Sequence, residues 1–257
     1  MDKGRLLSVY SKGQAIIWFH GLFGLFCLAI GAAAAACGFY PPLRRMGLTA
    51  GAAFLLLAAF FVKTAWDARQ AAEYAAYENG IERMGTPPVF YPYQEIEDVF
   101  LFMTGKYRFG PNNVAFRRGP DDSWQWISAH LKGTLVLDDM LNQYVQKRAP
   151  LLLGQIKDGR KISFRYFESD QAGVDQFFSW DGRGFLRRTP KILALDQKNL
   201  IFNENAIPLS QLKPLLQLGA DEFQIQRLDG QVVFSFQPTN VGSFDVFRRV
   251  FNQLVAR

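Results

Sequence analysis

The side chains able to perform acid–base, nucleophilic or metal chemistry are few and widely separated in this sequence. The only histidines are His20 and His130, and the only cysteines, Cys27 and Cys37, both lie in an N-terminal apolar region. A zinc site or a Cys–His nucleophile pair needs several such residues together, so neither can be assembled. The sequence also contains no glycine-rich phosphate-binding loop. We therefore expect no enzyme activity, no cofactor and no metal site.

Neighbouring carboxylates, which glycosidases place across a cleft, occur at three positions. These are Glu95/Glu97/Asp98, Asp121/Asp122 and Asp138/Asp139. Each has a simpler structural interpretation: a solvated strand edge for the first, turn residues for the second and a helix start for the third. The carboxylates therefore predict no hydrolase.

The chain carries 29 basic and 23 acidic side chains, for a formal charge of +6, and the excess is unevenly distributed. Residues 1–75 hold seven basic and three acidic side chains, whereas residues 76–257 hold 22 and 20. Nucleic-acid binding needs a basic surface, which the second region lacks. A hydrophobic content of 49% also excludes a disordered chain.

One basic cluster, Lys157, Arg160 and Lys161, flanks Asp158-Gly159 in what we expect to be a hairpin turn. Anionic lipid headgroups attract such residues by about 1 kcal/mol each near a membrane surface. The cluster is therefore a candidate anionic-lipid contact. An ordinary solvated turn is the alternative and the more common situation.

A second cluster combines aromatic and arginine side chains, as the energetically dominant residues of protein interfaces do. It consists of Phe177, Phe178, Trp180, Phe185, Arg187 and Arg188. These residues form a candidate partner-binding patch. They are equally consistent with aromatic side chains that close a hydrophobic core.

Two long uncharged runs near the N-terminus predict membrane-spanning helices. No charged side chain occurs in the 31 residues between Lys12 and Arg44, and a second run extends from Met46 to Val62. About 20 apolar residues cross a bilayer as a helix. The first run is too long for a signal peptide, and a second run follows it directly. We expect a tail at 1–14, helices at 15–40 and 46–66, and a short loop at 41–45.

Small and basic residues predict how this helical hairpin packs and how it is oriented. Gly47 and Gly51 share one helix face, where backbones can approach closely; we expect hairpin packing, with homodimerisation as the alternative. Basic residues on the outer flanks outnumber Arg44 and Arg45 in the loop. By the positive-inside rule, both termini are expected in the cytoplasm, with the helices in a bacterial inner membrane.

The remaining chain shows the same order of elements twice. Short runs rich in aromatic and β-branched residues, separated by turn signals, precede amphipathic helices near 135–148 and at the C-terminus. These runs predict paired strands at 114–127, at 198–209 and, around the turn Asp229-Gly230, at 223–236. The spacing Tyr93-x-x-Ile96-x-x-Val99 also matches Leu209-x-x-Leu212-x-x-Leu215. We expect an internal repeat, preceded by a helical continuation over Asp67–Tyr77.

The segments Glu78-Asn79-Gly80-Ile81, Gly159–Phe164 and Ile207–Leu212, each near a short turn or a strand end, resemble bacterial pleckstrin-homology-like (PH-like) domains. The resemblance implies an α+β membrane protein in which a two-helix transmembrane hairpin precedes two PH-like β-barrel or sandwich repeats, each closed by a C-terminal helix. The domains would occupy 67–150 and 151–257, the second with an insertion at 168–190 that departs from the family pattern.

This architecture implies binding or scaffolding and no particular reaction. We expect a membrane-anchored interaction protein that binds a protein partner or the membrane surface through residues 76–257, which should fold by themselves. The alternative is an immunity or accessory protein of a membrane-acting toxin, secretion or envelope complex. Nucleic acid is not an expected partner.

Overall fold

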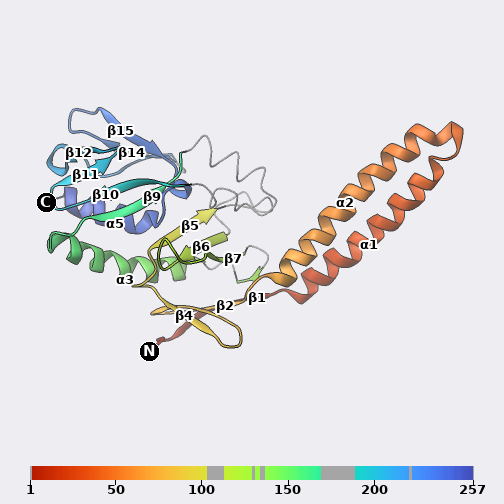
Figure 1. The fold of residues 1–257 in the computed structure, drawn as a ribbon, viewed down its shortest axis with the longest axis horizontal. Helices are drawn as coiled ribbons and strands as arrows, with labels where there is room; N and C mark the ends of the chain where they lie inside the picture. The colour runs from red at the N-terminus through yellow and green to blue at the C-terminus, as the bar shows by residue number, and fades with distance from the viewer. Residues whose placement is uncertain are drawn as a thin grey trace. The chain divides into compact units, whose positions relative to one another are not determined.

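A computed structural model describes residues 2–102, 113–128, 131–133, 137–168, 189–219 and 222–256. The chain forms two compact units. The helical unit comprises residues 11–73 and 130–132, and the β-rich unit comprises residues 1–10, 74–129 and 133–257. Figure 1 shows the elements of both units in chain order.

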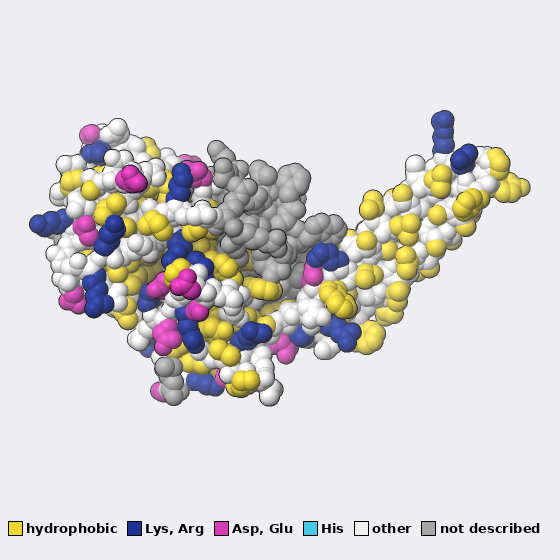
Figure 2. All heavy atoms as spheres, in the orientation of Figure 1, with side chains coloured by type: hydrophobic (Ala, Val, Ile, Leu, Met, Phe, Trp, Pro, Cys, Tyr) yellow, Lys and Arg dark blue, Asp and Glu magenta, His cyan; other side chains and the backbone are white. Residues whose placement is uncertain are grey.

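The helical unit is a hairpin of α1 (Gln14–Cys37) and α2 (Arg44–Gln70), joined through the 3-10 turn η1 (Pro41–Leu43). Two stretches, Ile17–Cys37 and Pro41–Gln70, are long and apolar enough to cross a membrane, each with a mean hydropathy of 1.8. Figure 2 shows hydrophobic side chains along both helices, with basic side chains only near the two ends of the hairpin. The predicted pair of long apolar helices is confirmed.

Gly47 and Gly51 lie where α2 makes backbone contact with α1. A Cβ atom at Gly47 would lie 2.6 Å from the Gly38 nitrogen and 2.8 Å from the Ala34 oxygen. A Cβ atom at Gly51 would lie 2.9 Å from the Ala35 nitrogen. Because backbone atoms cannot move aside as a flexible side chain can, this contact requires glycine.

Substituting Gly47 by alanine is therefore expected to open the hairpin and lower its thermal stability in detergent. The closest atoms are backbone atoms of Gly38 and Ala34, so the two helices must move apart to make room for the added side chain. Gly21→Ala is the matched control, since a Cβ at Gly21 meets nothing within 4 Å. Equal melting temperatures for the two variants would contradict this packing.

The β-rich unit consists of two halves built from four sheets and two helices. Strands of the first half are β1 (Leu6–Lys12), β2 (Tyr74–Tyr77), β3 (Gly80–Arg83), β4 (Val89–Pro92), β5 (Asp98–Phe102), β6 (Asn113–Arg117) and β7 (Gln125–Ile127), followed by α3 (Leu137–Lys157). The short strand β8 (Leu131–Lys132) belongs to the helical unit and pairs with the last two residues of β1. Strands of the second half are β9 (Ile162–Tyr166), β10 (Lys191–Leu195), β11 (Asn199–Phe202), β12 (Asn205–Pro208), β13 (Leu216–Leu218), β14 (Glu222–Gln226) and β15 (Val232–Phe236), followed by α5 (Phe244–Val255).

Apart from β8, the described strands of the two halves follow the same order. The first contains the sheets β4-β3-β2-β1-β8 and β5-β6-β7, and the second contains β12-β11-β10-β9 and β13-β14-β15. In each half an antiparallel four-strand run is followed by a three-strand sheet and then by a long helix. The helical hairpin joins β1 to β2, at the connection where the second half carries residues 167–190 between β9 and β10.

The sheets are not closed barrels, which corrects the barrel expectation. Among the described residues, β4 does not pair with β5, and β12 does not pair with β13. Each half therefore consists of two separate open sheets. The predicted β-hairpins β6–β7, β11–β12 and β14–β15 are confirmed by their antiparallel registers.

Two expectations for the residues flanking the hairpin are wrong. Residues 1–14 are not merely a tail, because β1 pairs with β2 through Tyr10↔Tyr74 and Val9↔Ala75. Nor does a helix continue to Tyr77, because α2 ends at Gln70 and the next ordered element is β2. Pairing with a distant strand overrides the helix-forming composition of this segment.

The boundary expected between residues 150 and 151 falls inside α3, which continues through Pro150 to Lys157. Gly159 ends the helix in the left-handed region, at a φ of 84°. Arg160 donates its amide to the Gln155 carbonyl and Gly159 donates its amide to Ile156, as in a Schellman cap. Residues 157–161 are thus a helix terminus leading into β9, and the expected β-hairpin turn is wrong.

The core follows the repeat spacing seen in the sequence. Tyr93, Ile96 and Val99 are buried, as are Leu209 and Leu212 at the corresponding positions, whereas Leu215 is only partly buried. One stripe of α5 is also buried: Phe244, Phe247, Val250, Phe251 and Leu254. Helices α3 and α5 pack against each other, and Figure 1 shows them side by side below strands of the second half.

Candidate functional site

The three basic residues predicted to contact lipid are exposed at the C-terminal end of α3. Lys157 is the last helical residue, and Arg160 and Lys161 follow the glycine cap. Cations at this position complement the negative end of the helix dipole. In the part of the chain that the structure describes, none of the three forms an ion pair.

Lys198, which the sequence did not single out, belongs to the same surface. The register Ile162↔Leu195 brings the turn between β10 and β11 beside the start of β9, and Gln197 donates a side-chain hydrogen bond to the Lys157 carbonyl. We call Lys157, Arg160, Lys161 and Lys198 the basic cluster. Its signal in the sequence was weak because Lys198 joins the other three only through strand pairing.

Two acidic residues neighbour the basic cluster along the chain: Asp158, which is exposed, and Asp196, which begins the turn between β10 and β11. The fold holds the Asp196 carboxylate in its charged form. Partial burial acts to raise its pKa, but amide hydrogen bonds from Lys198 and Asn199, at 2.7 Å each, and the charge of Lys161 lower the pKa overall. The Asp196 carboxylate thus accepts hydrogen bonds within its own turn. It offsets the cluster's positive charge only in part.

The predicted partner-binding patch (Phe177, Phe178, Trp180, Phe185, Arg187 and Arg188) lies outside the described residues. His130 also lies outside them, whereas His20 is buried in the helical unit beside Phe61, with the ring centroids 5.6 Å apart. Within the described ranges, no group of three or more His, Cys, Asp or Glu side chains is placed to hold a metal ion.

The prediction that Asp98 lies on a solvated strand edge is wrong, because its side chain is only 3% exposed. Arg117, its cross-strand partner, donates from Nε at 2.7 Å. Arg165, in β9 of the second half, donates from one terminal nitrogen to both carboxylate oxygens at 2.7 Å. This buried ionic group joins the two halves, and Glu97 beside it remains 46% exposed.

A second polar contact joins the halves at the start of α5. Ser243, at a φ of 53°, donates its amide to the Val99 carbonyl at 2.6 Å and accepts the Val99 amide at its Oγ at 3.1 Å. Its Oγ also lies 2.7 Å from the buried Tyr144 hydroxyl of α3. The N-terminus of α5 is therefore anchored to β5 and α3.

Burial raises the pKa of Tyr144 and of Tyr74 from 10.0 to about 12. Both pKa values are raised on folding, so their contribution to stability is complete below pH 10 and declines as the pH rises toward 12. We expect alkaline unfolding in this window, with phenolate absorbance and loss of β-sheet circular dichroism appearing together. Phenolate formation by all nine tyrosines before any loss of structure would contradict these burial effects.

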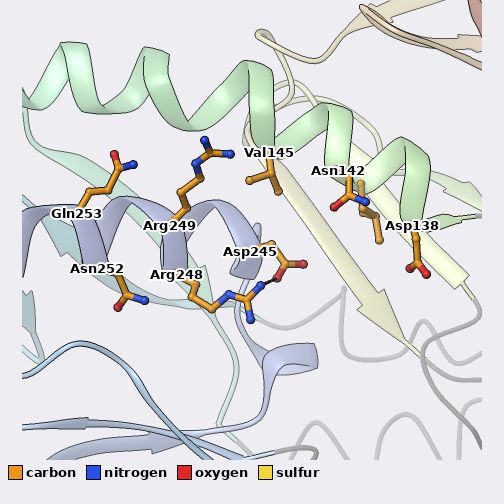
Figure 3. Close-up of a pocket in the computed structure, with 9 residues that line it drawn as sticks. Asp138, Asn142, Val145, Asp245, Arg248, Arg249, Asn252 and Gln253 are labelled. Carbon is orange, nitrogen blue, oxygen red and sulfur yellow. Dashed lines mark ion pairs between the residues drawn. The ribbon is translucent and has the colours of Figure 1, made fainter.

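A groove of about 620 Å³ lies between α3 and α5. Among the described residues, its lining comes from these two helices, and Figure 3 shows Arg249 and Gln253 extending from α5 toward α3. The lining residues are Asp138, Leu141, Asn142 and Val145 on α3, and Asp245, Arg248, Arg249, Asn252 and Gln253 on α5. We call this the interhelix groove.

Charge in the interhelix groove is balanced and partly paired. Arg248 and Asp245 form an ion pair at 3.0 Å, drawn as a dashed line in Figure 3. Burial raises the pKa of Asp245, with Asp138 adding to the effect and Arg248 opposing it. Local sequence patterns predict the two helices but not the groove, because the contact between α3 and α5 joins residues about a hundred positions apart.

Comparison with protein-family models, curated proteins and solved structures finds no match to this chain.

Proposed function

We propose that this chain is a membrane-anchored, non-enzymatic interaction protein whose two halves are PH-like domains at the cytoplasmic face of the inner membrane. The observation that carries the proposal is how the hairpin joins the sheet. One residue, Gly13, separates β1 from α1, and three residues, 71–73, separate α2 from β2. Three residues span at most about 10 Å, so both chain connections between the hairpin and the strands are short.

The β1 pairing also favours retention of the first helix over its removal as a signal peptide. β1 has a strand neighbour on each side, β2 and β8, and cleavage after α1 would remove it from the sheet. Because β1 and β2 are adjacent, the N-terminus and the chain after α2 belong on one side of the membrane. The basic flanks assign that side to the cytoplasm.

The shared strand order supports the PH-like assignment. Each half has a four-strand run, a three-strand sheet and a closing helix, in that order along the chain. In this interpretation, the helical hairpin is an insertion between the first two strands of the first domain.

The basic cluster gives this module a membrane-facing role. Its four cations lack ion-pair partners among the described residues, and each would gain about 1 kcal/mol near an anionic surface. Tethering by α1 and α2 raises the local concentration of the cluster near the headgroups, so even a weak contact becomes populated.

The test is hydrogen–deuterium exchange of the full chain in nanodiscs of zwitterionic or anionic lipid. We expect amides at 157–161 and 196–198 to exchange more slowly in anionic nanodiscs. Replacing Lys157, Arg160 and Lys161 with glutamate should abolish this difference.

The matched control replaces three cations that already form ion pairs. These are Arg5, which pairs with Glu78; Lys191, which pairs with Glu168; and Arg248, which pairs with Asp245. This second triple glutamate variant should keep the lipid-dependent protection. Protection that is equal in both lipids, or unchanged by the first glutamate variant, would refute the membrane contact. Recovery of the wild-type chain in the soluble fraction of cells would refute the anchor.

A further inference from the structure

The interhelix groove has the dimensions and regularity of a segment-binding site. On α3 the lining residues fall at positions 138, 141, 142 and 145, and on α5 at 245, 248, 249 and 252. Both sets follow the i, i+3, i+4, i+7 spacing of one helix face. Each stripe extends about 10 Å at 1.5 Å per residue, which is roughly two helical turns.

Two oppositely charged side chains in the groove have no partner among the described residues. Arg248 and Asp245 satisfy each other, but within the described chain Arg249 and Asp138 have neither a hydrogen bond nor an ion pair. Figure 3 shows Arg249 extending from α5 toward α3, and Asp138 extending from the first turn of α3 on the facing side. Both side chains are exposed and free to meet a ligand.

The uncharged lining suits a peptide. Asn142 and Gln253 offer side-chain amides that can both donate to and accept from backbone groups, while Leu141 and Val145 supply half-buried apolar surface. Asn252 uses its carbonyl oxygen to accept the Leu215 amide, at 2.8 Å, and is held in place by that bond.

The charge balance argues against the common anionic ligands. The lining contains two arginines and two aspartates, so its formal net charge is zero. A phosphate or an anionic headgroup would meet Asp138 and Asp245 as well as the arginines, and like charges at close range disfavour binding. The volume lies within the range of about 300–1,000 Å³ typical of ligand sites, but the polar lining does not suit an apolar small molecule.

We infer that the interhelix groove receives a short segment of a partner polypeptide, with an acidic side chain directed to Arg249 and a basic side chain directed to Asp138. This site is separate from the basic cluster and does not depend on the membrane contact. It joins the two halves of the β-rich unit, because α3 closes the first half and α5 closes the second.

The test selects a random-peptide phage library against the full chain in nanodiscs and measures affinities by fluorescence anisotropy. Enriched peptides are expected to carry an acidic and a basic residue. Arg249→Glu should weaken their binding by about tenfold or more, as expected for loss of a charged hydrogen bond and gain of repulsion. Replacing the peptide's acidic residue by lysine should restore binding to Arg249→Glu.

Asp138→Lys should likewise weaken peptide binding, and replacing the peptide's basic residue by glutamate should restore the affinity. Arg160→Glu and Asp121→Lys, which reverse exposed charges outside the groove, should leave affinity unchanged. Peptides that bind all four variants as they bind wild type, or a selection with no enrichment, would overturn the inference. A failed membrane contact would instead appear only in the exchange experiment, so the two proposals fail separately.

Discussion

Deleting residues 2–12 is expected to unfold the β-rich unit, whereas removing the whole helical hairpin is expected to leave it folded. In the second variant, residues 13–71 are replaced by Asn-Gly. The register of β1 and β2 ends at Tyr10↔Tyr74. Continued in the excised chain, this register would place Lys12 opposite Ala72, so a two-residue turn can close the pair of strands. The first variant removes a strand that lies between β2 and β8 and contributes the fully buried Tyr10.

The physical reason is the size of the loss relative to the stability of a domain. Removing one large buried side chain costs about 3–5 kcal/mol, and typical domains are stable by about 5–15 kcal/mol. Loss of β1 also leaves the backbone groups along β2 without their strand partners. Size-exclusion chromatography and a thermal melt followed by circular dichroism distinguish a folded monomer from an aggregate.

Two point variants provide a matched control for the role of β1. Tyr10→Ala should cost about 3–5 kcal/mol because the ring is fully buried. Val9→Ala on the same strand should cost less than about 1 kcal/mol, because Val9 is 42% exposed. If residues 74–257 alone melt cooperatively at the temperature of the hairpin-excised variant, β1 is not part of the folded unit.

Asp98→Ala is expected to destabilise the β-rich unit by about 3–5 kcal/mol, because breaking a buried ion pair leaves charge without compensation. Two guanidinium groups lose their shared acceptor, and Arg117 and Arg165 are only 12% and 17% exposed. Urea unfolding of the hairpin-excised variant measures the change. Since Arg165 belongs to the second half, both halves should unfold together at lower urea.

Glu97→Ala is the neighbouring control, with its carboxylate 3.9 Å from Arg165 and 46% exposed. Exposed pairs contribute about 0–1 kcal/mol, so this variant should unfold almost as wild type does. Equal unfolding midpoints for Asp98→Ala and Glu97→Ala would contradict the ionic link between the halves. Separate transitions for the two halves of the wild-type unit would contradict it as well.

Features set by local pattern were predictable from the sequence. Two uncharged runs predicted α1 and α2, and the Asp229-Gly230 turn between apolar runs predicted the β14–β15 hairpin. The apolar spacing after residue 244 predicted the buried face of α5. Each of these signals depends on residues within one helix or one hairpin.

Features set by distant contacts were not predictable. β1 finds its partner β2 more than sixty residues away, across the whole hairpin, and nothing local marks Leu6–Lys12 as a strand. Asp98 appeared solvated because Arg165 is 67 residues away in the sequence. The interhelix groove depends in the same way on the meeting of α3 and α5.

The most direct test of the account is the accessibility of single cysteines to a membrane-impermeant maleimide in intact cells and in inverted membrane vesicles. Reporters would replace Arg5, Phe39 and Arg160, in a chain with Cys27 and Cys37 changed to serine; all three positions are exposed. The account predicts that positions 5 and 160 react only in inverted vesicles and that position 39 reacts only in intact cells. Reaction of positions 5 and 160 from opposite sides, or of position 39 from the cytoplasmic side, would contradict a hairpin that anchors one β-rich unit at the cytoplasmic face.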